Sequence, residues 1–285
     1  MTTSLLEICV NGSFFPENQP VLTASDRGLL LGDGLFETIR VYQQKPFLIQ
    51  QHLTRMLASA RHFRFPLLPD SFVIHSWLQA LIERNQIQTG YARVTLTRGL
   101  KQSPGLYLDQ ESHPQIIIET KPLEYREMTW NITLAEVRRS RTSLISAHKT
   151  TNYLENLMVL DQAKNEGFDE AILCVEEGLV QEGTRTNLFF VEENQLFTPP
   201  LELGPLPGIT RGLVMNQLQH GYPVTELPFA WDSVRMADEV FLTNSLWGII
   251  EVSRVDELHK PAGKVTQKLK QVYLQYVQSF KETKI

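Results

Sequence analysis

The fold is constrained most by the irregular order in which strand-like and helix-like spacings of apolar residues follow one another along the 285-residue chain. Strand-like runs lead into two-residue turns at Asn11-Gly12 and at Gln43-Gln44, which is typical of β-hairpins. Helical spacing begins near residue 51. A doubly wound parallel sheet needs strands and helices in regular alternation, so the order found here predicts an α+β fold.

Helices are predicted where apolar residues recur at positions i, i+3 and i+4, and Pro66 and Gly167 end two of them. The predicted helices cover residues 51–63, 71–85, 153–165, 208–220 and 265–280. Strands are predicted at residues 6–10, 36–42, 45–49, 91–97, 115–120, 129–136, 170–175, 186–191, 195–198, 239–243 and 249–252.

Two segments interrupt this pattern. The stretch from Gly99 to Pro114 contains two glycines and two prolines, so we predict a long, functional loop there. The polar segment 121–128 is the best candidate for a domain boundary.

Charge and hydropathy exclude several classes of partner. The net charge is −5 and no cluster of Lys and Arg forms, whereas nucleic-acid binding depends on such clusters. No run approaches the roughly 18 apolar residues of a membrane helix, and the first thirty residues do not resemble a secretion signal. We therefore expect a cytoplasmic protein that binds neither nucleic acid nor membrane. Cys9 and Cys174 lie in apolar runs without further ligands at metal spacing, so we expect core thiols and no metal site.

Two residues in the second half of the chain suit catalysis. Lys149 precedes a predicted helix start instead of lying on an exposed helix face, and a desolvated lysine amine can form imines. Glu182 lies in a polar, glycine-containing stretch between apolar strands, where a carboxylate could face a pyridinium nitrogen. Taken singly, each is more often a solvated surface charge.

Two further segments offer hydrogen-bond donors. Pro207-Gly208 precedes a predicted helix start, where Thr210 can cap and backbone N–H groups can bind phosphate. An unoccupied helix start is the ordinary interpretation of such a segment. The strand at Phe241-Leu242 runs into Thr243-Asn244-Ser245, whose hydroxyl and amide groups suit a phosphate or a substrate.

Several motifs follow one another in a distinctive order. They are Asp26-Arg27-Gly28, Gly32-Asp33-Gly34-Leu35-Phe36-Glu37-Thr38, His52-Leu53-Thr54-Arg55-Met56, Lys149 with Asn152-Tyr153-Leu154, Glu182 with Asn187-Leu188-Phe189, and Pro207-Gly208-Ile209-Thr210. In this order they resemble the fold-type IV pyridoxal-5′-phosphate (PLP) enzymes. That family includes branched-chain and D-amino-acid aminotransferases, R-selective amine transaminases and 4-amino-4-deoxychorismate lyases. The resemblance covers nearly the whole chain.

The resemblance implies two domains and a bound cofactor. Residues 1–120 would form a smaller N-terminal α+β domain, and residues 121–285 a larger, barrel-like C-terminal domain that binds PLP. Lys149 would hold PLP as a Schiff base and move protons during catalysis. Glu182 would pair with the pyridine nitrogen, and Tyr153 would lie near the cofactor ring.

The resemblance also implies which residues bind the cofactor phosphate: Arg55, Ile209, Thr210 and Ser245. A guanidinium with backbone donors suits a phosphate, although an arginine like Arg55 is by itself more often a surface residue.

The residues that separate the members of the family favour a 4-amino-4-deoxychorismate lyase, which would release pyruvate and 4-aminobenzoate, a folate precursor. D-amino-acid enzymes resemble one another in an Arg-x-His pair that Thr97 to Ser103 lacks. The string Thr243-Asn244-Ser245-Leu246 is more similar to the lyases than to branched-chain enzymes. Against this, Tyr91-Ala92-Arg93 resembles the branched-chain enzymes, and Glu251 stands where many lyases have proline. The alternative is therefore an aminotransferase for branched-chain or D-amino acids.

Five residues are candidate substrate contacts. Thr38 and Arg40 alternate on one strand face, and Asn244, Tyr107 and Arg93 are added by the resemblance. Ordinary strand polarity is the alternative for the first two, and an ion pair within the sheet is the alternative for Arg93.

The resemblance further implies a homodimer, because in this family a loop of the neighbouring subunit completes the active site. The stretch from Gly99 to Pro114 is where that loop would fall. A non-catalytic small-molecule binding protein on the same scaffold is the alternative of another class. The joint presence of Lys149, Glu182 and Arg55 counts against it.

Overall fold

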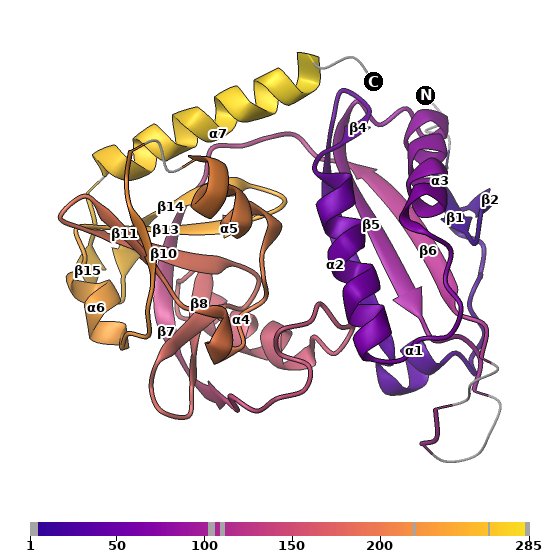
Figure 1. Cartoon of the computed structure of the whole chain (residues 1–285), viewed down its shortest axis with the longest axis horizontal. Helices are drawn as coiled ribbons and strands as arrows, with labels where there is room; N and C mark the ends of the chain where they lie inside the picture. The colour runs from indigo at the N-terminus through magenta and orange to yellow at the C-terminus, as the bar shows by residue number, and fades with distance from the viewer. Residues whose placement is uncertain (1–4, 102–105, 109–111, 219–220, 262, 283–285) are drawn as a thin grey trace. The chain divides into compact units, whose positions relative to one another are not determined.

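The computed structural model describes residues 5–101, 106–108, 112–218, 221–261 and 263–282 (Figure 1). The chain divides into two compact units. The first unit comprises residues 1–124 together with the short segment His148–Asn152. The second comprises residues 125–147 and 153–285.

The first unit is an antiparallel sheet of six strands with the order β2-β1-β6-β5-β3-β4. The strands are β1 (Glu7–Val10), β2 (Ser13–Pro16), β3 (Gly34–Tyr42), β4 (Lys45–Pro46), β5 (Thr89–Thr97) and β6 (Gln115–Pro122). The helices are α1 (Arg27–Leu31), α2 (Ile49–His62) and α3 (Ser71–Arg84).

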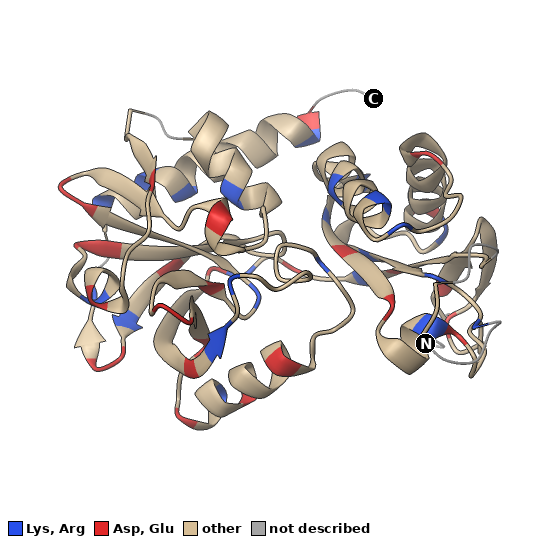
Figure 2. Cartoon of the chain, turned by 60° about the horizontal axis from the view of Figure 1, so that its bottom comes forward, with Lys and Arg blue, Asp and Glu red and all other residues tan. Residues whose placement is uncertain are grey.

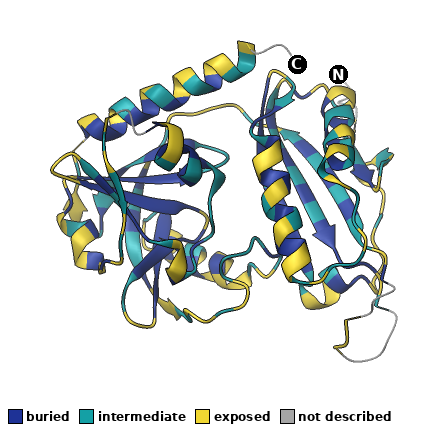
Figure 3. Ribbon diagram, in the orientation of Figure 1, coloured by how far each residue is buried: buried dark blue, intermediate teal, exposed yellow. Residues whose placement is uncertain are grey.

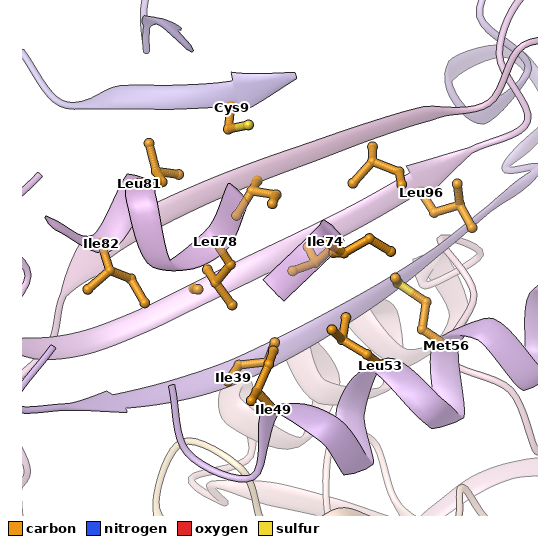
Figure 4. Packing of buried hydrophobic residues seen from close by; sticks show 14 of the residues in the cluster. Cys9, Ile39, Ile49, Leu53, Met56, Ile74, Leu78, Leu81, Ile82 and Leu96 are labelled. Carbon is orange, nitrogen blue, oxygen red and sulfur yellow. The ribbon is translucent and has the colours of Figure 1, made fainter. Parts of the chain in front are cut away.

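Helices α2 and α3 cover one face of this sheet, and each buries one side while the other side remains exposed (Figures 1 and 3). Ile39 of β3, Leu53 and Met56 of α2 and Leu78 of α3 meet in a single apolar cluster (Figure 4). The carboxylate of Asp70 caps α3 by accepting from the amide of Val73 at 3.0 Å.

One predicted strand of the first unit is shorter than expected. Strand β4 ends at Pro46, although the sequence pattern predicted extended structure to residue 49. The amide of Phe47 donates to the carbonyl of Arg40, and Leu48 adopts a left-handed conformation with φ of 53°. This turn redirects the chain, so that α2 begins at Ile49.

The second unit is a mixed sheet of nine strands. Its order is β12-β11-β10-β13-β14-β7-β8-β9, with β15 paired to β14. The strands are β7 (Thr129–Arg139), β8 (Glu170–Val175), β9 (Val180–Gly183), β10 (Asn187–Glu192), β11 (Gln195–Thr198), β12 (Val224–Glu226), β13 (Glu239–Asn244), β14 (Gly248–Val255) and β15 (Leu258–His259). Strand β7 is parallel to both of its neighbours, β8 and β14.

Four α-helices accompany the second sheet: α4 (Leu154–Asn165), α5 (Ile209–Leu213), α6 (Trp231–Met236) and α7 (Lys264–Glu282). The helix predicted at residues 208–220 is not one regular helix, because α5 continues into a π-helical turn, Val214–Leu218. Residues 219–220 of that prediction lie outside the described residues. The two units, with a curled second sheet, confirm the predicted α+β fold of the fold-type IV kind.

Acidic and basic residues are interspersed along both units (Figure 2). In the described part of the chain, none of the helices has the length and apolar character needed to cross a bilayer. Cys9 and Cys174 are buried and unpaired, as predicted.

The core of the first unit should tolerate truncation poorly. Leu78 is fully buried, whereas Leu67, in the irregular segment before α3, is 98% exposed. We expect Leu78→Ala to lower the free energy of unfolding by about 2–5 kcal/mol, because it removes buried methyl groups and leaves a cavity. Leu67→Ala should change it by less than about 0.5 kcal/mol. Urea unfolding followed by circular dichroism checks this, and equal midpoints for the two variants would contradict the described core.

Candidate active site

Lys149 lies in the segment His148–Asn152, which is attached to strand β3. The amide of Phe36 donates to the carbonyl of Lys149 at 2.9 Å, and the amide of Thr151 donates to the carbonyl of Gly34 at 2.9 Å. Between these bonds, Leu35 and Thr150 form an antiparallel bridge. The backbone of Lys149 is therefore held like a residue of an added strand, and only its side chain remains to position the amine.

The side chain of Lys149 lies beside an aromatic ring. Its Nζ is 4.3 Å from the centroid of the Phe36 ring. The guanidinium carbon of Arg93 is 3.8 Å from the same centroid. Cations are attracted to the faces of aromatic rings, so Phe36 gathers the two positive groups at one place.

Strand β3 directs its side chains to two different faces, because successive residues of a strand alternate. Its odd-numbered apolar residues join the core beneath α2 and α3. Phe36, Thr38 and Arg40 therefore point to the opposite face, where Thr38 is in register with Arg93 of β5. Three predicted substrate contacts are thus brought together with the amine of Lys149.

Glu37 is the charged member of the helix-covered face of β3. Its carboxylate accepts hydrogen bonds from Nε and Nη2 of Arg55 at 2.8 and 2.6 Å. Nδ1 of His52 lies 2.6 Å from the same carboxylate. Glu37 and His52 are buried, and the side chain of Arg55 is only 11% exposed. One edge of the Arg55 guanidinium is therefore fixed by a bidentate ion pair.

The two ionisable partners in this cluster have shifted pKa values. Burial raises the pKa of Glu37, but the charge of Arg55 and the hydrogen bond from His52 outweigh burial and hold it at about 2. Burial lowers the pKa of His52, and the charges of Arg55 and Lys149 act in the same direction, while Glu37 opposes them. Both pKa values are lowered, so at neutral pH Glu37 is a carboxylate and His52 is a neutral imidazole that donates to it from Nδ1.

Glu182 lies on β9 in the second unit and is buried. Its Oε2 accepts from the amide of Leu206 at 3.0 Å and from Nδ2 of Asn187 at 3.4 Å. Its Oε1 lies 3.4 Å from Nη1 of Arg139, which also bonds to Asn156 at 2.7 Å through Nη2. These donors fix the orientation of the carboxylate.

The start of α5 is fastened to the end of β13. The hydroxyl of Thr210 donates to the carbonyl of Asn244 at 3.0 Å. The side-chain oxygen of Asn244 accepts from the amides of Leu246 and Trp247 at 3.1 and 2.9 Å, which forms a tight turn around Ser245. Gly208 is required here, because a Cβ at this position would lie 1.9 Å from the side-chain oxygen of Asn187.

The remaining predicted site residues lie at the ends of elements or in loops. Tyr153 directly precedes α4, and its carbonyl accepts from the amide of Leu157. Ile209 is the first residue of α5 and Ser245 lies in the turn after β13. Tyr107 is 76% exposed, and its carbonyl accepts from Nη1 of Arg27 at 3.1 Å. Tyr107 lies outside strands β3 and β5, which carry Thr38, Arg40 and Arg93.

Sequence reasoning assigned no role to Glu37, His52 or Arg139, although the first two lie within quoted motifs. Glu37 could have been noticed, because it is a carboxylate at a position where the alternation of β3 demands an apolar side chain. His52 and Arg55 are three residues apart on one helix and therefore share a side. No local signal marks Arg139, since it precedes its partner Glu182 by 43 residues.

Comparison with known proteins places this arrangement in a family. The model of the family described as amino-transferase class IV matches residues 34–255. A relative from Methanocaldococcus jannaschii named "Putative branched-chain-amino-acid aminotransferase" is 33% identical over 94% of this chain and 95% of its own. A crystal structure from Legionella pneumophila named "Putative 4-amino-4-deoxychorismate lyase" is 32% identical, with a TM-score of 0.86 over 91% of this chain and 96% of its own.

A third similar protein is a T.th. branched-chain amino acid aminotransferase, whose crystal structure was solved with pyridoxamine 5′-phosphate. It is 25% identical, with a TM-score of 0.90 over 96% of this chain and 95% of its own. The chain belongs to the class IV aminotransferase family. The predicted family is therefore confirmed, and with it a PLP-dependent enzyme.

Stability in acid should depend on Glu37 and His52. The pKa of Glu37 is about 2 in the folded protein and 4.5 for an ordinary glutamate, so its contribution is complete above about pH 4.5 and is lost as the pH falls toward 2. The lowered pKa of His52 reduces stability at a higher pH than Glu37 does. As the pH falls below 6.5, the unfolded chain binds a proton at His52 that the folded chain does not. We expect Glu37→Gln to lose about 3 kcal/mol at pH 7. It should also lose less additional stability than wild type between pH 5 and 3.

Thermal unfolding from pH 8 to pH 3 measures both effects. Glu124→Gln changes an exposed glutamate in the same unit and should follow the wild type throughout. Parallel pH profiles for wild type and Glu37→Gln would show that the cluster does not govern acid stability.

Proposed function

We propose that the chain is a 4-amino-4-deoxychorismate lyase that releases pyruvate and 4-aminobenzoate. The main support is the face of β3 and β5 beside the amine of Lys149, which carries the hydroxyl of Thr38 and the guanidinium groups of Arg40 and Arg93. The substrate of this lyase has two carboxylates and one amine. A branched-chain amino acid has one carboxylate and an aliphatic side chain, and that side chain would be matched by an apolar surface. Two cations suit the dicarboxylate.

The residues present fit PLP in chemical type. A lysine amine suits its aldehyde, a buried carboxylate suits its ring nitrogen, and a guanidinium with hydroxyl and backbone donors suits its phosphate. When bound, PLP withdraws electrons from the carbon that bears the substrate amine, so that a proton can leave that carbon.

The chain's own groups would then divide the work. Lys149 would hold the cofactor through its amine and would take and return protons as a general base and acid. Glu182, oriented by Leu206, Asn187 and Arg139, would pair with the ring nitrogen and keep it protonated. Tyr153 would lie near the cofactor ring.

The phosphate would be bound by Arg55, Ile209, Thr210 and Ser245. Glu37 supports this assignment because it holds one edge of the Arg55 guanidinium in place. Asn244 supports it through the turn that positions Ser245, and it also contacts the substrate in our proposal.

An aminotransferase is the second candidate, because the relative from Methanocaldococcus jannaschii carries that name and because Tyr91-Ala92-Arg93 resembles the branched-chain enzymes. The lyase and the aminotransferase share the first proton removal and differ in what leaves afterwards. A non-catalytic binding protein is disfavoured, because Lys149, Glu182 and Arg55 are all retained.

The lyase proposal predicts two products in equal amounts. Purified protein given freshly generated aminodeoxychorismate should release 4-aminobenzoate, measured by fluorescence, and pyruvate at the same rate. Lys149→Ala should lower this rate at least about a thousandfold, because the group that moves the proton is gone. Lys164→Ala, at an exposed position of α4, is the matched control and should retain full activity.

The alternative has its own readout in the same samples. Conversion of branched-chain or D-amino acids to keto acids, without release of 4-aminobenzoate, would establish the aminotransferase and refute the lyase. The lyase reaction would place the protein in folate precursor synthesis in the cytoplasm.

We also propose a homodimer in which Tyr107 and its loop reach the partner's site. Leu29, Leu30 and Leu31 of α1 and Leu106 and Tyr107 are exposed apolar residues of the first unit, which is unusual for a surface that faces only water. Residues 102–105 and 109–111 of the predicted loop lie outside the described residues.

Light scattering tests the dimer. A chain of 32.7 kDa should give a particle of about 65 kDa, twice the chain mass, and Leu30→Glu should shift it toward the monomer, because a charge would be buried at the interface. A wild-type particle with the mass of one chain would refute the homodimer.

A further inference from the structure

Arg40 is a buried cation without a hydrogen-bond partner. Its side chain is fully buried, and none of its three guanidinium nitrogens has a hydrogen-bond partner. Among the residues that the structure describes, no other arginine lacks partners at all three buried nitrogens. Buried Arg27 and Arg98 both bond to the carboxylate of Asp33 at 2.8 Å, and buried Arg211 bonds to the carbonyl of Pro199 at 3.0 Å.

The neighbours of Arg40 offer it aromatic contact but no anion. Its guanidinium carbon is 5.3 Å from the centroid of Tyr42, and on β5 it is in register with Tyr91. Glu37 belongs to the opposite face of β3 and bonds to Arg55 and His52. Glu119 of β6 shares the face of Arg40, in register with Arg93, but within the described residues no hydrogen bond joins a carboxylate to this guanidinium.

An unpaired buried cation is costly, and an arginine cannot avoid the cost by losing its proton. A partner that arrives from outside removes the penalty. The planar guanidinium forms two parallel hydrogen bonds with a carboxylate, so a carboxylate is the anion whose shape it matches.

The position of Arg40 along β3 indicates which carboxylate it would bind. Arg40 is four residues beyond Phe36, which is about 13 Å along a strand. The amine of Lys149 lies against the Phe36 ring. This is a spacing of backbone positions, and a carboxylate on the far side of a six-membered ring spans more of it than a carboxylate on the carbon that bears the reacting amine.

We infer that Arg40 binds the substrate carboxylate that lies away from the reacting amine. In aminodeoxychorismate this is the ring carboxylate opposite the amine, which becomes the carboxylate of 4-aminobenzoate. The identity of the reacting amine rests on the proposed function, but the unpaired guanidinium is an observation of its own. Arg40 then makes the site selective for substrates that carry an amine and a carboxylate at opposite ends of a ring.

The test compares an acid with its amide. Binding of 4-aminobenzoate and of uncharged 4-aminobenzamide to the PLP-loaded protein is measured by calorimetry. The wild type should bind the acid at least about tenfold more tightly than the amide. Arg40→Met should bind both with similar affinity. Arg61→Met, at an exposed position of α2, should keep the wild-type preference.

Stability and colour separate this role from others. Because Arg40→Met removes an unpaired buried charge, it should melt no lower than the wild type when ligand is absent. Melting well below the wild type would mean that the folded chain pairs Arg40 internally, and would overturn the inference. If Arg40→Met fails to retain PLP, Arg40 serves the cofactor phosphate, and the inference is equally wrong.

Arg40→Lys keeps the positive charge and should retain part of the preference for the acid over the amide. It provides the test if the Met variant does not fold.

The binding measurement does not require turnover, so the two proposals can fail separately. A wild type that prefers the acid through Arg40 but forms no product would refute the lyase and keep the inference. A wild type that binds acid and amide equally, or binds neither, would overturn the inference whatever its activity.

Discussion

The attachment of Lys149 to strand β3 is the constraint on which the candidate site depends. Backbone hydrogen bonds from Phe36 to Lys149 and from Thr151 to Gly34 fix the backbone that carries the amine, so it is held more firmly than a lysine in a surface loop. The same strand uses its two faces for different purposes. One face holds Glu37, which orients Arg55, and the other holds Arg40 and the aromatic ring beside Lys149. A slip of one residue in the pairing of β3 would exchange these faces.

Much of the fold could be predicted from the sequence because its longer elements have clear periodicity. The helix predicted at residues 51–63 is found at Ile49–His62, and the strand predicted at 91–97 is found within Thr89–Thr97. Helix α1 was missed because five residues are too few to display a helical period. The strand predicted at residues 45–49 was too long because a single left-handed residue, Leu48, ends it, and leucine gives no sign of that conformation.

The site could be predicted only as far as local motifs reach. Lys149, Glu182 and Arg55 were predicted as site residues because each stands in a motif of the family, whereas the partners that orient Glu182 and Arg55 come from other parts of the chain. Glu182 is oriented by Arg139 and by the amide of Leu206, 43 residues before it and 24 after it. Sequence spacing does not encode such contacts, because they arise only when strands from separate segments pair.

Buried charges differ sharply in how completely the fold satisfies them, and this difference separates scaffold from site. Burial raises the pKa of Glu170, but its carboxyl group accepts hydrogen bonds from the amide and the hydroxyl of Thr184 and from the hydroxyl of Thr186. The carboxylate of Glu37 likewise has hydrogen-bond partners within the protein, Arg55 and His52. Arg40 is as deeply buried and has no such partners. Among the described residues, the fold leaves the three guanidinium nitrogens of Arg40 without partners where a small anionic molecule can supply the missing bonds, and this favours a substrate with a carboxylate away from its reacting amine.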